Sequence, residues 1–434
     1  MLENTTIFLI INMISAIPYS LITPLLPTLG QEKDLSEGIL GCIISLYPLS
    51  MSIFSPIIPI LGKKYSRIKL LSLATFFISV ITVLYAFLLL ISNKTLLLII
   101  VFTMRIFHGI CSAIISILLY SLTISYAEKG KTQSSLGRLE VAYSIGSSTG
   151  FLVDSVFFKI GGYPLPFFVA GFCSFISFCL TFKINDKNIQ KDTEEKKEED
   201  NYNYLKYLYN PEILAILIGF IIIMITITFY IPCLTNHLNN NYSISVSMVS
   251  LLFITPIIPY IIIMHFLDSI TAKFGNYITF ISGIIALGIA NVMIYPVPPL
   301  PQSFIVVFIG ILICGNETVP AFIPGIVILS KNIKKMDKSI EEMSANDIAS
   351  VLYSICMEIG DFLGPVLGGY LSEKFGFKLC CVIISIIVMT YVSIFILLFF
   401  GKIKTDIKMI SQGKKSESNE DDKKGEENKK LKIN

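Results

Sequence analysis

Long apolar stretches, separated by short polar or charged segments, dominate the pattern of this chain. A helix needs about 20 apolar residues to cross the hydrocarbon core of a membrane. Runs this continuous predict helices, because the strands of a membrane barrel alternate apolar and polar positions. We therefore predict twelve transmembrane helices, over residues 6–29, 37–61, 69–92, 96–125, 137–158, 164–184, 212–235, 244–267, 276–296, 302–330, 348–372 and 377–401.

The composition agrees with an all-α membrane protein. Of 434 residues, 53% are hydrophobic and 15% are charged, whereas a soluble domain carries about 25% charged residues. The start of the chain lacks the basic segment and the small-residue cleavage site of a signal peptide, so we interpret it as an uncleaved first span. The nine cysteines lie in or near spans without a C-x-x-C pair, which favours packing over a disulfide framework.

Lysine and arginine are concentrated on one side of the predicted spans. If the loop 63–69 is cytoplasmic, that side holds 28 of the 34 Lys and Arg residues and the other side holds 5, with Arg105 inside a span. Because cytoplasmic loops are enriched in positive charge, we expect both termini in the cytoplasm. The pattern leaves open whether the membrane is vesicular, endolysosomal or the plasma membrane. The net charge of +3 then reflects topology and gives no indication of a nucleic-acid partner.

The spans are organised as two halves of six. The segment GFLVDSVFFKIGGY (150–163) aligns with GPVLGGYLSEKFGF (364–377) at a constant offset of 214 residues. Duplicated halves are typical of transporters whose central site lies between the halves. We predict an N-terminal half over 1–184, a cytoplasmic linker over 185–211, a C-terminal half over 212–401 and a disordered cytoplasmic tail over 402–434.

Several motifs resemble signatures of the major facilitator superfamily, in particular its proton-coupled antiporters. The matching residues are Gly364, Pro365, Gly368 and Gly369 of GPVLGG, Arg105 and Gly109 of RIFHG, Pro24 and Pro27 of PLLP, and the basic loop residues Lys63, Lys64 and Arg67. Longer segments, such as MEIGDFLGPVLGGYLSEKFGF (357–377), resemble the vesicular amine and polyamine transporters. The resemblance covers nearly all of 6–184 and 212–401. It implies the twelve-helix major facilitator fold and exchange of small organic cations for protons.

The sequence also departs from the family pattern. Lys63 and Ala272 occupy loop positions where the family has an acid, which leaves open whether the loop still supports gating. Asp154 occupies the position in the fifth span that corresponds to Gly368 in the eleventh. No role of the family can therefore be carried over to Asp154.

Ionisable residues inside the spans are the candidate functional residues. A charge at the centre of a bilayer costs at least ~2.5–3.5 kcal/mol, so such residues face protein or water and carry a partner or a proton. Against each stands a structural alternative, namely pairing within a gate, a hydrogen bond at a helix kink, contact with backbone carbonyls, or simple packing. The candidates for binding substrate or protons are Glu317, Glu358, Asp361, Arg105, Asp154 and His108.

Small residues at a spacing of four mark the helix faces that come close to a neighbour. Such stripes occur at Gly360, Gly364 and Gly368, and again at Gly146, Gly150 and Asp154. Glu140 stands at the start of the fifth span. It belongs either to the cytoplasmic gate or to a helix start, where carboxylates are favoured.

The sequence contains no P-loop, no metal-ligand spacing and no nucleophile with a paired base, so we expect no enzymatic activity and no cofactor. The favoured hypothesis is a monomeric secondary transporter that exchanges small organic cations for protons by alternating access, with the proton gradient as its energy source and lipid as its surroundings. Two alternatives remain: an uncoupled or symporting facilitator of a neutral or anionic metabolite, and a non-transporting membrane receptor or scaffold.

Overall fold

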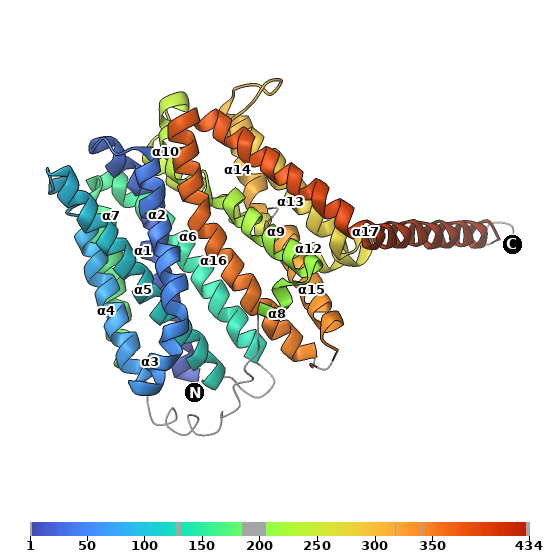
Figure 1. Cartoon of the computed structure of the whole chain (residues 1–434), viewed down its shortest axis with the longest axis horizontal. Coiled ribbons are helices and arrows are strands. Elements are labelled where there is room, and N and C mark those ends of the chain that lie inside the picture. Colours follow the sequence, from blue (N-terminus) through green and yellow to red (C-terminus); the bar gives the residue numbers. More distant parts are fainter. Residues whose placement is uncertain are drawn as a thin grey trace. The chain divides into compact units, whose positions relative to one another are not determined.

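The structure is a computed structural model that describes residues 2–126, 132–184, 205–316, 318–338, 340 and 342–430. Every regular element in these residues is a helix, which confirms the predicted all-α class (Figure 1). Eleven helices in the described part of the chain are long and apolar enough to cross a membrane. The predicted span over 244–267 is divided into α11 (Val246–Leu252) and α12 (Ile257–Phe274), because Pro256 at the break has no N–H to continue a helix.

The helices form two compact units that differ from the two predicted halves. Unit 1 comprises residues 1–201, 227–255 and 357–381, and unit 2 comprises residues 202–226, 256–356 and 382–434. Two segments of the predicted C-terminal half therefore pack within unit 1. The predicted halves follow the sequence repeat, whereas the units follow tertiary contacts, and the boundaries of the repeat stay a prediction.

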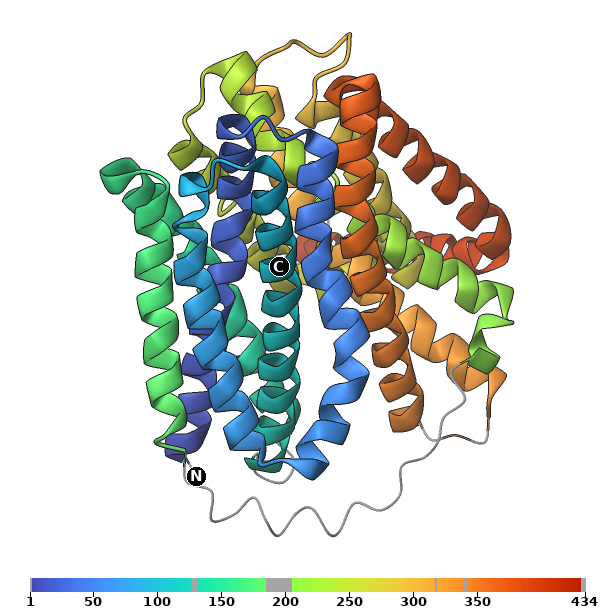
Figure 2. The same ribbon diagram turned by 60° about the vertical axis from the view of Figure 1, so that its left-hand side comes forward.

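Unit 1 contains the first helices of the chain, which run side by side in Figures 1 and 2. They are α1 (Leu2–Glu32), α2 (Glu37–Phe54), η1 (Ser55–Ile57), α3 (Ile58–Lys64), α4 (Arg67–Tyr85), η2 (Leu88–Leu90), α5 (Lys94–Tyr126), α6 (Thr132–Gly161) and α7 (Pro164–Thr181). To these it adds α10 (Ile231–Tyr242), α11, and parts of α16 (Glu342–Phe375) and α17 (Phe377–Lys430).

Polar residues between the apolar stretches start these helices. The Ser36 hydroxyl accepts a hydrogen bond from Ile39 N at 3.4 Å, and the Asn93 amide oxygen accepts one from Leu96 N at 3.0 Å. Such caps satisfy backbone N–H groups that the first helical turn leaves free. Gly162 and Gly376, which the sequence repeat aligns, both follow a helix with positive φ, at 64° and 81°. A residue with a Cβ is strained there, which explains a glycine at both repeated positions.

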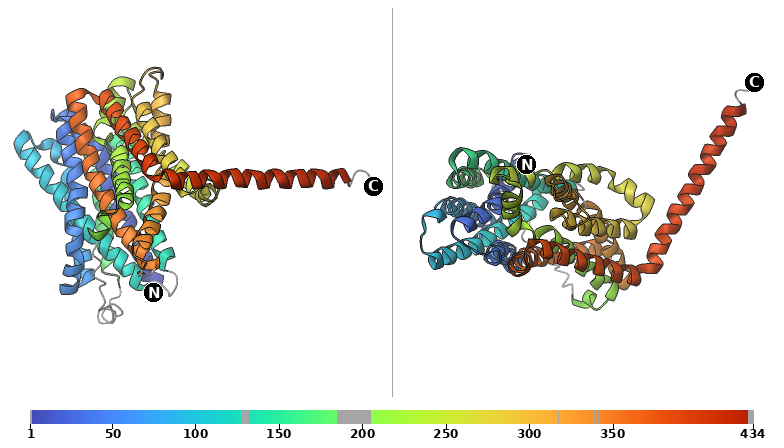
Figure 3. Two further views of the ribbon diagram at one scale, coloured as in Figure 1. Left: turned by 45° about the vertical axis from the view of Figure 1, so that its right-hand side comes forward. Right: turned by 90° about the horizontal axis from the view of Figure 1, so that it is seen from above.

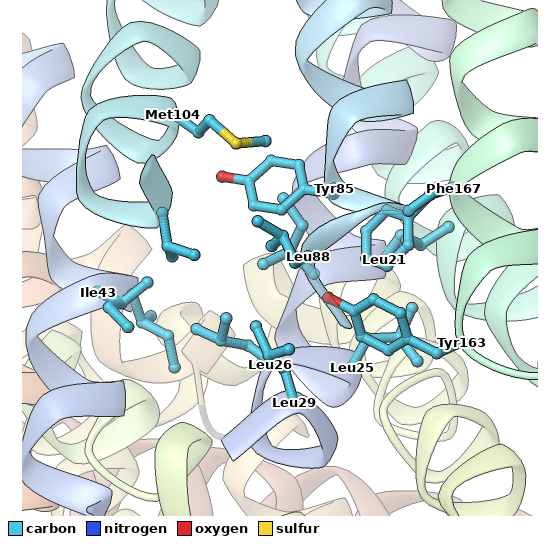
Figure 4. Close-up of a cluster of buried hydrophobic side chains, with 14 of the residues drawn as sticks. Leu21, Leu25, Leu26, Leu29, Ile43, Tyr85, Leu88, Met104, Tyr163 and Phe167 are labelled. Atoms are coloured by element: carbon cyan, nitrogen blue, oxygen red, sulfur yellow. The ribbon is translucent and has the colours of Figure 1, made fainter. Parts of the chain in front are cut away.

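Glycines let α1 and α6 approach closely. A methyl group on Gly146 would overlap the carbonyl oxygen of Met13, and one on Gly150 would overlap Ser20 Oγ. The predicted stripe of small residues is therefore a true helix-packing face. Apolar residues of α1 also form a buried cluster with α2, α4, α5 and α7, shown in Figure 4. Its large members include Leu21, Tyr85 and Phe167.

Unit 2 contains the remaining helices, which are α8 (Leu205–Leu208), α9 (Pro211–Thr228), α12, α13 (Asn276–Ile294), α14 (Phe304–Asn316), α15 (Thr318–Met336) and the other parts of α16 and α17. Aromatic rings fill its centre: Phe220 lies 5.0 Å from Tyr353 and 6.3 Å from Phe280, between ring centroids. The Tyr391 hydroxyl donates to the Ala215 carbonyl at 2.9 Å and thereby ties α17 to α9.

Helix α17 continues past the predicted end of the last span, through the non-helical residue Phe399, to Lys430 (Figure 3). Its first polar residues are anchored within unit 2. Lys402 Nζ pairs with Glu212 Oε2 at 2.6 Å, and the Asp406 carboxylate accepts a hydrogen bond from Tyr277 N at 3.0 Å, at the start of α13. The start of the predicted tail is therefore part of α17 and contacts unit 2, through contacts that require the tertiary fold and leave no mark on local composition. The predicted disorder of the rest of the tail stays a prediction.

Candidate functional site

A polar cavity of about 320 Å³ lies within unit 1. Its lining combines three carboxylates, four phenols, three serine hydroxyls and one amide with only two apolar side chains. Among the described residues that line it, none is Lys, Arg or His. The lining residues are Asn12, Ser15, Tyr19, Tyr47, Met51, Ser112, Ile115, Ser116, Tyr120, Glu140, Tyr143, Glu358 and Asp361.

Five helices supply these residues at helical spacing. Helix α5 contributes Ser112, Ser116 and Tyr120, which are four residues apart and therefore share one face. Helix α6 contributes Glu140 and Tyr143, which are three residues apart. Each helix presents a polar stripe to the cavity within an otherwise apolar span. This is the arrangement by which a membrane protein keeps polar side chains away from lipid.

Glu358 and Asp361 reach the cavity from α16. Both are partly buried, and Asp361 interacts electrostatically with Glu358 and with Arg105. Pro365 lies one turn further along α16 and has no N–H, so the Asp361 carbonyl lacks its usual helical partner. The structure thus brings together Glu358 and Asp361 from the candidates for binding, and it adds Glu140, which the sequence assigned to a gate or a helix start.

Arg105 lies behind the cavity wall rather than in it. Its side chain is 2% exposed, and its guanidinium carbon lies 5.1 Å from the centroid of the Tyr47 ring. Arg105 Nη2 donates to the Ile44 carbonyl at 2.9 Å, and Nε donates to the Ile43 carbonyl at 3.2 Å. Pro48 cannot supply the helical hydrogen bond that Ile44 would otherwise accept. Arg105 therefore replaces that bond, as the structural alternative for this residue predicted.

His108 is buried one turn after Arg105. Its ring lies 5.1 Å from the Tyr47 ring in an edge-to-face arrangement. Neither ring nitrogen has a hydrogen-bond partner among the described residues. His108 therefore packs against the outer side of Tyr47 and does not line the cavity. On the helix face of Arg105, one turn on, a methyl group on Gly109 would clash with the Tyr47 carbonyl oxygen, so α5 and α2 are in close contact there.

The antiparallel helices α2 and α16 cross closely at one end of the cavity. A methyl group on Gly41 would overlap the Pro365 carbonyl oxygen, and one on Gly369 would overlap the Glu37 carbonyl oxygen. Gly38 N donates to Glu373 Oε2 at 3.1 Å beside this crossing. Because no side chain fits between these backbones, α2 and α16 are in direct contact there.

The predicted glycine stripe lies on buried positions of α16. Gly360 and Gly364 are buried on α16, and a methyl group on Gly368 would overlap the Phe229 carbonyl oxygen. Gly368 therefore serves close packing against Phe229. None of these three glycines lines the cavity.

Two further candidates for binding lie elsewhere. Asp154 is fully buried on α6, where its carboxyl group is hydrogen-bonded to Ser250 Oγ of α11. It is not among the residues that line the cavity. Glu317 lies outside the described residues. Its predicted role stays a prediction.

The remaining motif residues occupy helix ends or helix interiors. Pro24 and Pro27 lie inside α1, which continues to Glu32. Lys63 and Lys64 end α3, and Arg67 begins α4. Arg67 Nη1 donates to Ser121 Oγ of α5 at 3.2 Å and so connects the loop to a neighbouring helix.

Sequence reasoning missed most of the cavity. It singled out ionisable residues and overlooked the phenols and hydroxyls beside them, of which Tyr19, Tyr47 and Tyr143 are examples. A signal was available, because Asn12, Ser15 and Tyr19 recur at spacings of three and four within an apolar span.

Two larger hollows occur in the described residues, one between α13 and α17 and one between α4, η2 and α5. Both are lined mainly by apolar side chains, and neither contains a carboxylate.

Comparison with known proteins gives sequence likeness over most of the chain. The MFS-type transporter SLC18B1 of Homo sapiens is 24% identical over 392 residues, which are 85% of this chain and 80% of that protein. An uncharacterized MFS-type transporter of Methanocaldococcus jannaschii, MJ1560, is 21% identical over 389 residues, 86% of this chain and 92% of that protein. The likeness to SLC18B1 confirms the resemblance found in the motifs.

Solved structures give the same fold. The nucleoside transporter NupG superposes with a TM-score of 0.71 at 12% identity, over 91% of this chain and 99% of that one. A bacterial homolog of the human lysosomal transporter Spinster, in an inward-facing and occupied conformation, gives a TM-score of 0.67 at 14% identity, over 94% of both chains. The family model of the Major Facilitator Superfamily matches residues 8–335 and 216–430. The chain therefore belongs to the Major Facilitator Superfamily and is a multi-pass membrane transporter.

Proposed function

We propose that this transporter exchanges small organic cations for protons through the polar cavity of unit 1. The observation that carries the proposal is the cavity lining, in which three carboxylates and four phenols occur without a basic side chain among the described lining residues. The membership in a transporter superfamily says that the protein moves a solute, and the cavity suggests the charge of that solute.

The lining favours a cation over a neutral or anionic metabolite. Carboxylates supply negative charge, which an anion would have to overcome in a site of low dielectric constant. The faces of aromatic rings attract ammonium groups, at a gain of about 0.5–2 kcal/mol for each good contact. Arg105 does not line the cavity, and its guanidinium lies against the ring of Tyr47, which does.

Shared carboxylates provide a simple form of antiport. A proton and a substrate cation both neutralise Glu358 and Asp361, so the binding of one favours release of the other. The cavity opens to one side of the membrane at a time if α2 and α16 separate at their crossing. In this proposal the proton gradient is the energy source and no cofactor takes part. The Lys and Arg distribution favours a cytoplasmic location of both termini.

Proteoliposomes with the purified protein and an internal pH dye test the proposal. After an inward-acidic gradient is imposed, spermidine, a monoamine, a sugar and an organic anion are added separately. We expect alkalinisation of the lumen with one of the cations, because cation entry is coupled to proton exit. The double substitution Glu358→Gln and Asp361→Asn should abolish the response while the overall shape of the cavity is kept.

Glu32→Gln is the matched control, since Glu32 is an exposed acid at the end of α1 and does not line the cavity. It should transport like the unsubstituted protein. Full proton-coupled cation exchange in the double variant would contradict the assignment of these acids. Solute uptake of the sugar or the anion without proton movement would instead identify an uncoupled facilitator.

A further inference from the structure

Helices α6 and α11 meet around a buried carboxyl group that the cavity does not use. Asp154 of α6 is fully buried, and it contacts Ser250 of α11, which is also fully buried. One turn earlier on α6, the Phe151 ring stacks on Phe253, with ring centroids 5.4 Å apart and planes 12° apart. Asp154 is therefore a polar contact within a tight helix interface.

The hydrogen bonds at this contact depend on whether the Asp154 carboxyl group is protonated. Ser250 Oγ contacts both Asp154 Oδ2 and the Val246 carbonyl oxygen, the latter at 3.0 Å. A hydroxyl has one hydrogen and can donate it once, and a carbonyl can only accept. Both contacts are hydrogen bonds only if Asp154 donates to Ser250 while Ser250 donates to Val246. That arrangement requires a protonated Asp154.

The second carboxyl oxygen leads to the same conclusion. Asp154 Oδ1 is buried and has no hydrogen-bond partner among the described residues. An ionised carboxylate with an unpaired buried oxygen is strongly unfavourable, whereas the carbonyl oxygen of a neutral acid loses far less. The interface thus suits a carboxylic acid and disfavours a carboxylate.

Among the described residues, the helices packed against Asp154 supply no positive side chain that would pair with an ionised carboxylate. Helices α7 and α11 contain no charged residue, and the charged residues of α1 are Glu3 and Glu32 at its two ends. On α5, Arg105 is held by carbonyls of α2. Tyr163, part of the adjoining apolar cluster, is the titratable group that interacts electrostatically with Asp154.

We propose that Asp154 is a second proton-binding site, separate from the cavity, which holds a proton while α6 and α11 are packed together and releases it when they separate. Separation would admit water to the carboxyl group and so favour its ionisation. By linkage, a lower pH then stabilises the packed interface. The site needs neither the cavity acids nor a substrate. This proposal can therefore be tested independently of the proposed antiport.

Infrared difference spectroscopy on the full chain in lipid, without substrate, is the direct test. At neutral pH we expect a C=O stretching band of a protonated carboxylic acid that disappears in Asp154→Asn, a substitution of nearly the same shape. Ser250→Ala should shift this band to higher frequency, because the acid loses its hydrogen-bond partner. Ser20→Ala, which removes another buried hydroxyl on the face that α1 presents to α6, should leave the band unchanged.

Hydrogen exchange is a second test. One of its measurements uses the unsubstituted protein and therefore does not depend on the folding of a variant. After correction for the intrinsic pH dependence of exchange, the amides of α11 should exchange faster as pH rises in the unsubstituted protein. Asp154→Asn should remove this dependence, because an amide side chain cannot ionise. Identical infrared spectra of Asp154→Asn and the unsubstituted protein, or pH-independent protection of α11 in the latter, would overturn the proposal.

Discussion

Arg105 shows how a single buried cation can serve the backbone of a neighbouring helix. Its two hydrogen bonds go to carbonyls of α2, and one of these carbonyls is left free by Pro48. The planar guanidinium reaches two acceptors at once, which an ammonium group cannot do in the same fixed geometry. A side chain of this kind holds α2 beside the cavity, where Tyr47 lines the wall.

The first prediction concerns this pairing of Arg105 with Pro48. Arg105→Lys should lower the free energy of unfolding by about 1–3 kcal/mol, because a buried carbonyl loses its partner. In a Pro48→Ala background the same substitution should cost less, since residue 48 then supplies an N–H to the Ile44 carbonyl. Thermal unfolding of the four variants in one double-mutant cycle measures the difference. Simple additivity would contradict the pairing.

The second prediction concerns the aromatic lining. Tyr19 lies in the cavity wall with its ring centroid 4.7 Å from that of Tyr47. Tyr19→Leu should raise the Kd for a transported cation about 2- to 30-fold, because a cation–π contact contributes about 0.5–2 kcal/mol to binding. Tyr19→Phe keeps the ring and should bind almost normally. Equal losses in calorimetric titrations of both variants would show that the hydroxyl, and not the ring face, binds the cation.

At the scale of elements, close helix crossings position the cavity. Helices α1 and α6 approach through Gly146 and Gly150, and α2 and α16 approach through Gly41 and Gly369. The polar cavity is lined by residues of these same four helices and of α5. The glycines thus allow neighbouring backbones to come close together. The position of α16 that results determines where its carboxylates lie.

The third prediction tests the crossing of α2 and α16. Gly369→Ala should cost about 1–3 kcal/mol, because the added methyl group overlaps the Glu37 carbonyl and forces the helices apart. Hydrogen exchange at the start of α2 should then become faster. Gly401→Ala is the control, since a Cβ at Gly401 meets nothing within 4 Å and alanine favours a helix. Unchanged protection of α2 in Gly369→Ala would argue against the close crossing.

At the scale of the whole molecule, exchange requires that protons and cations compete. The fourth prediction is that the Kd for the transported cation rises as pH falls, by at most about tenfold per pH unit for each proton displaced. Protonation removes the negative charge that holds the cation, so affinity is present at high pH and lost at low pH. Glu358→Gln should reduce this slope. A Kd that is constant across titrations over about pH 5 to 8 would exclude competition at the carboxylates.

Much of the fold was predictable because its determinants are local. Apolar stretches of membrane length, helix caps such as Ser36, and the glycines at 162 and 376 act through neighbouring residues. The break at Pro256 and the anchoring of Asp406 on α13 were not predicted. The anchoring of Asp406 depends on a contact between residues far apart in the chain, which local composition does not record. The break follows from the missing N–H of Pro256, a local signal that was present in the sequence and was overlooked.

The sequence by itself determined the class of protein, the helical spans and the acids worth attention, because burial of a charge in a membrane segment is costly wherever it occurs. Tertiary structure alone decided which of these groups share a site. It placed Glu140, Glu358 and Asp361 in one cavity with four tyrosines, turned Arg105 to the backbone of α2, and set Asp154 against Ser250. Spacing along one helix defines a face, but which faces meet depends on how helices distant in sequence pack together.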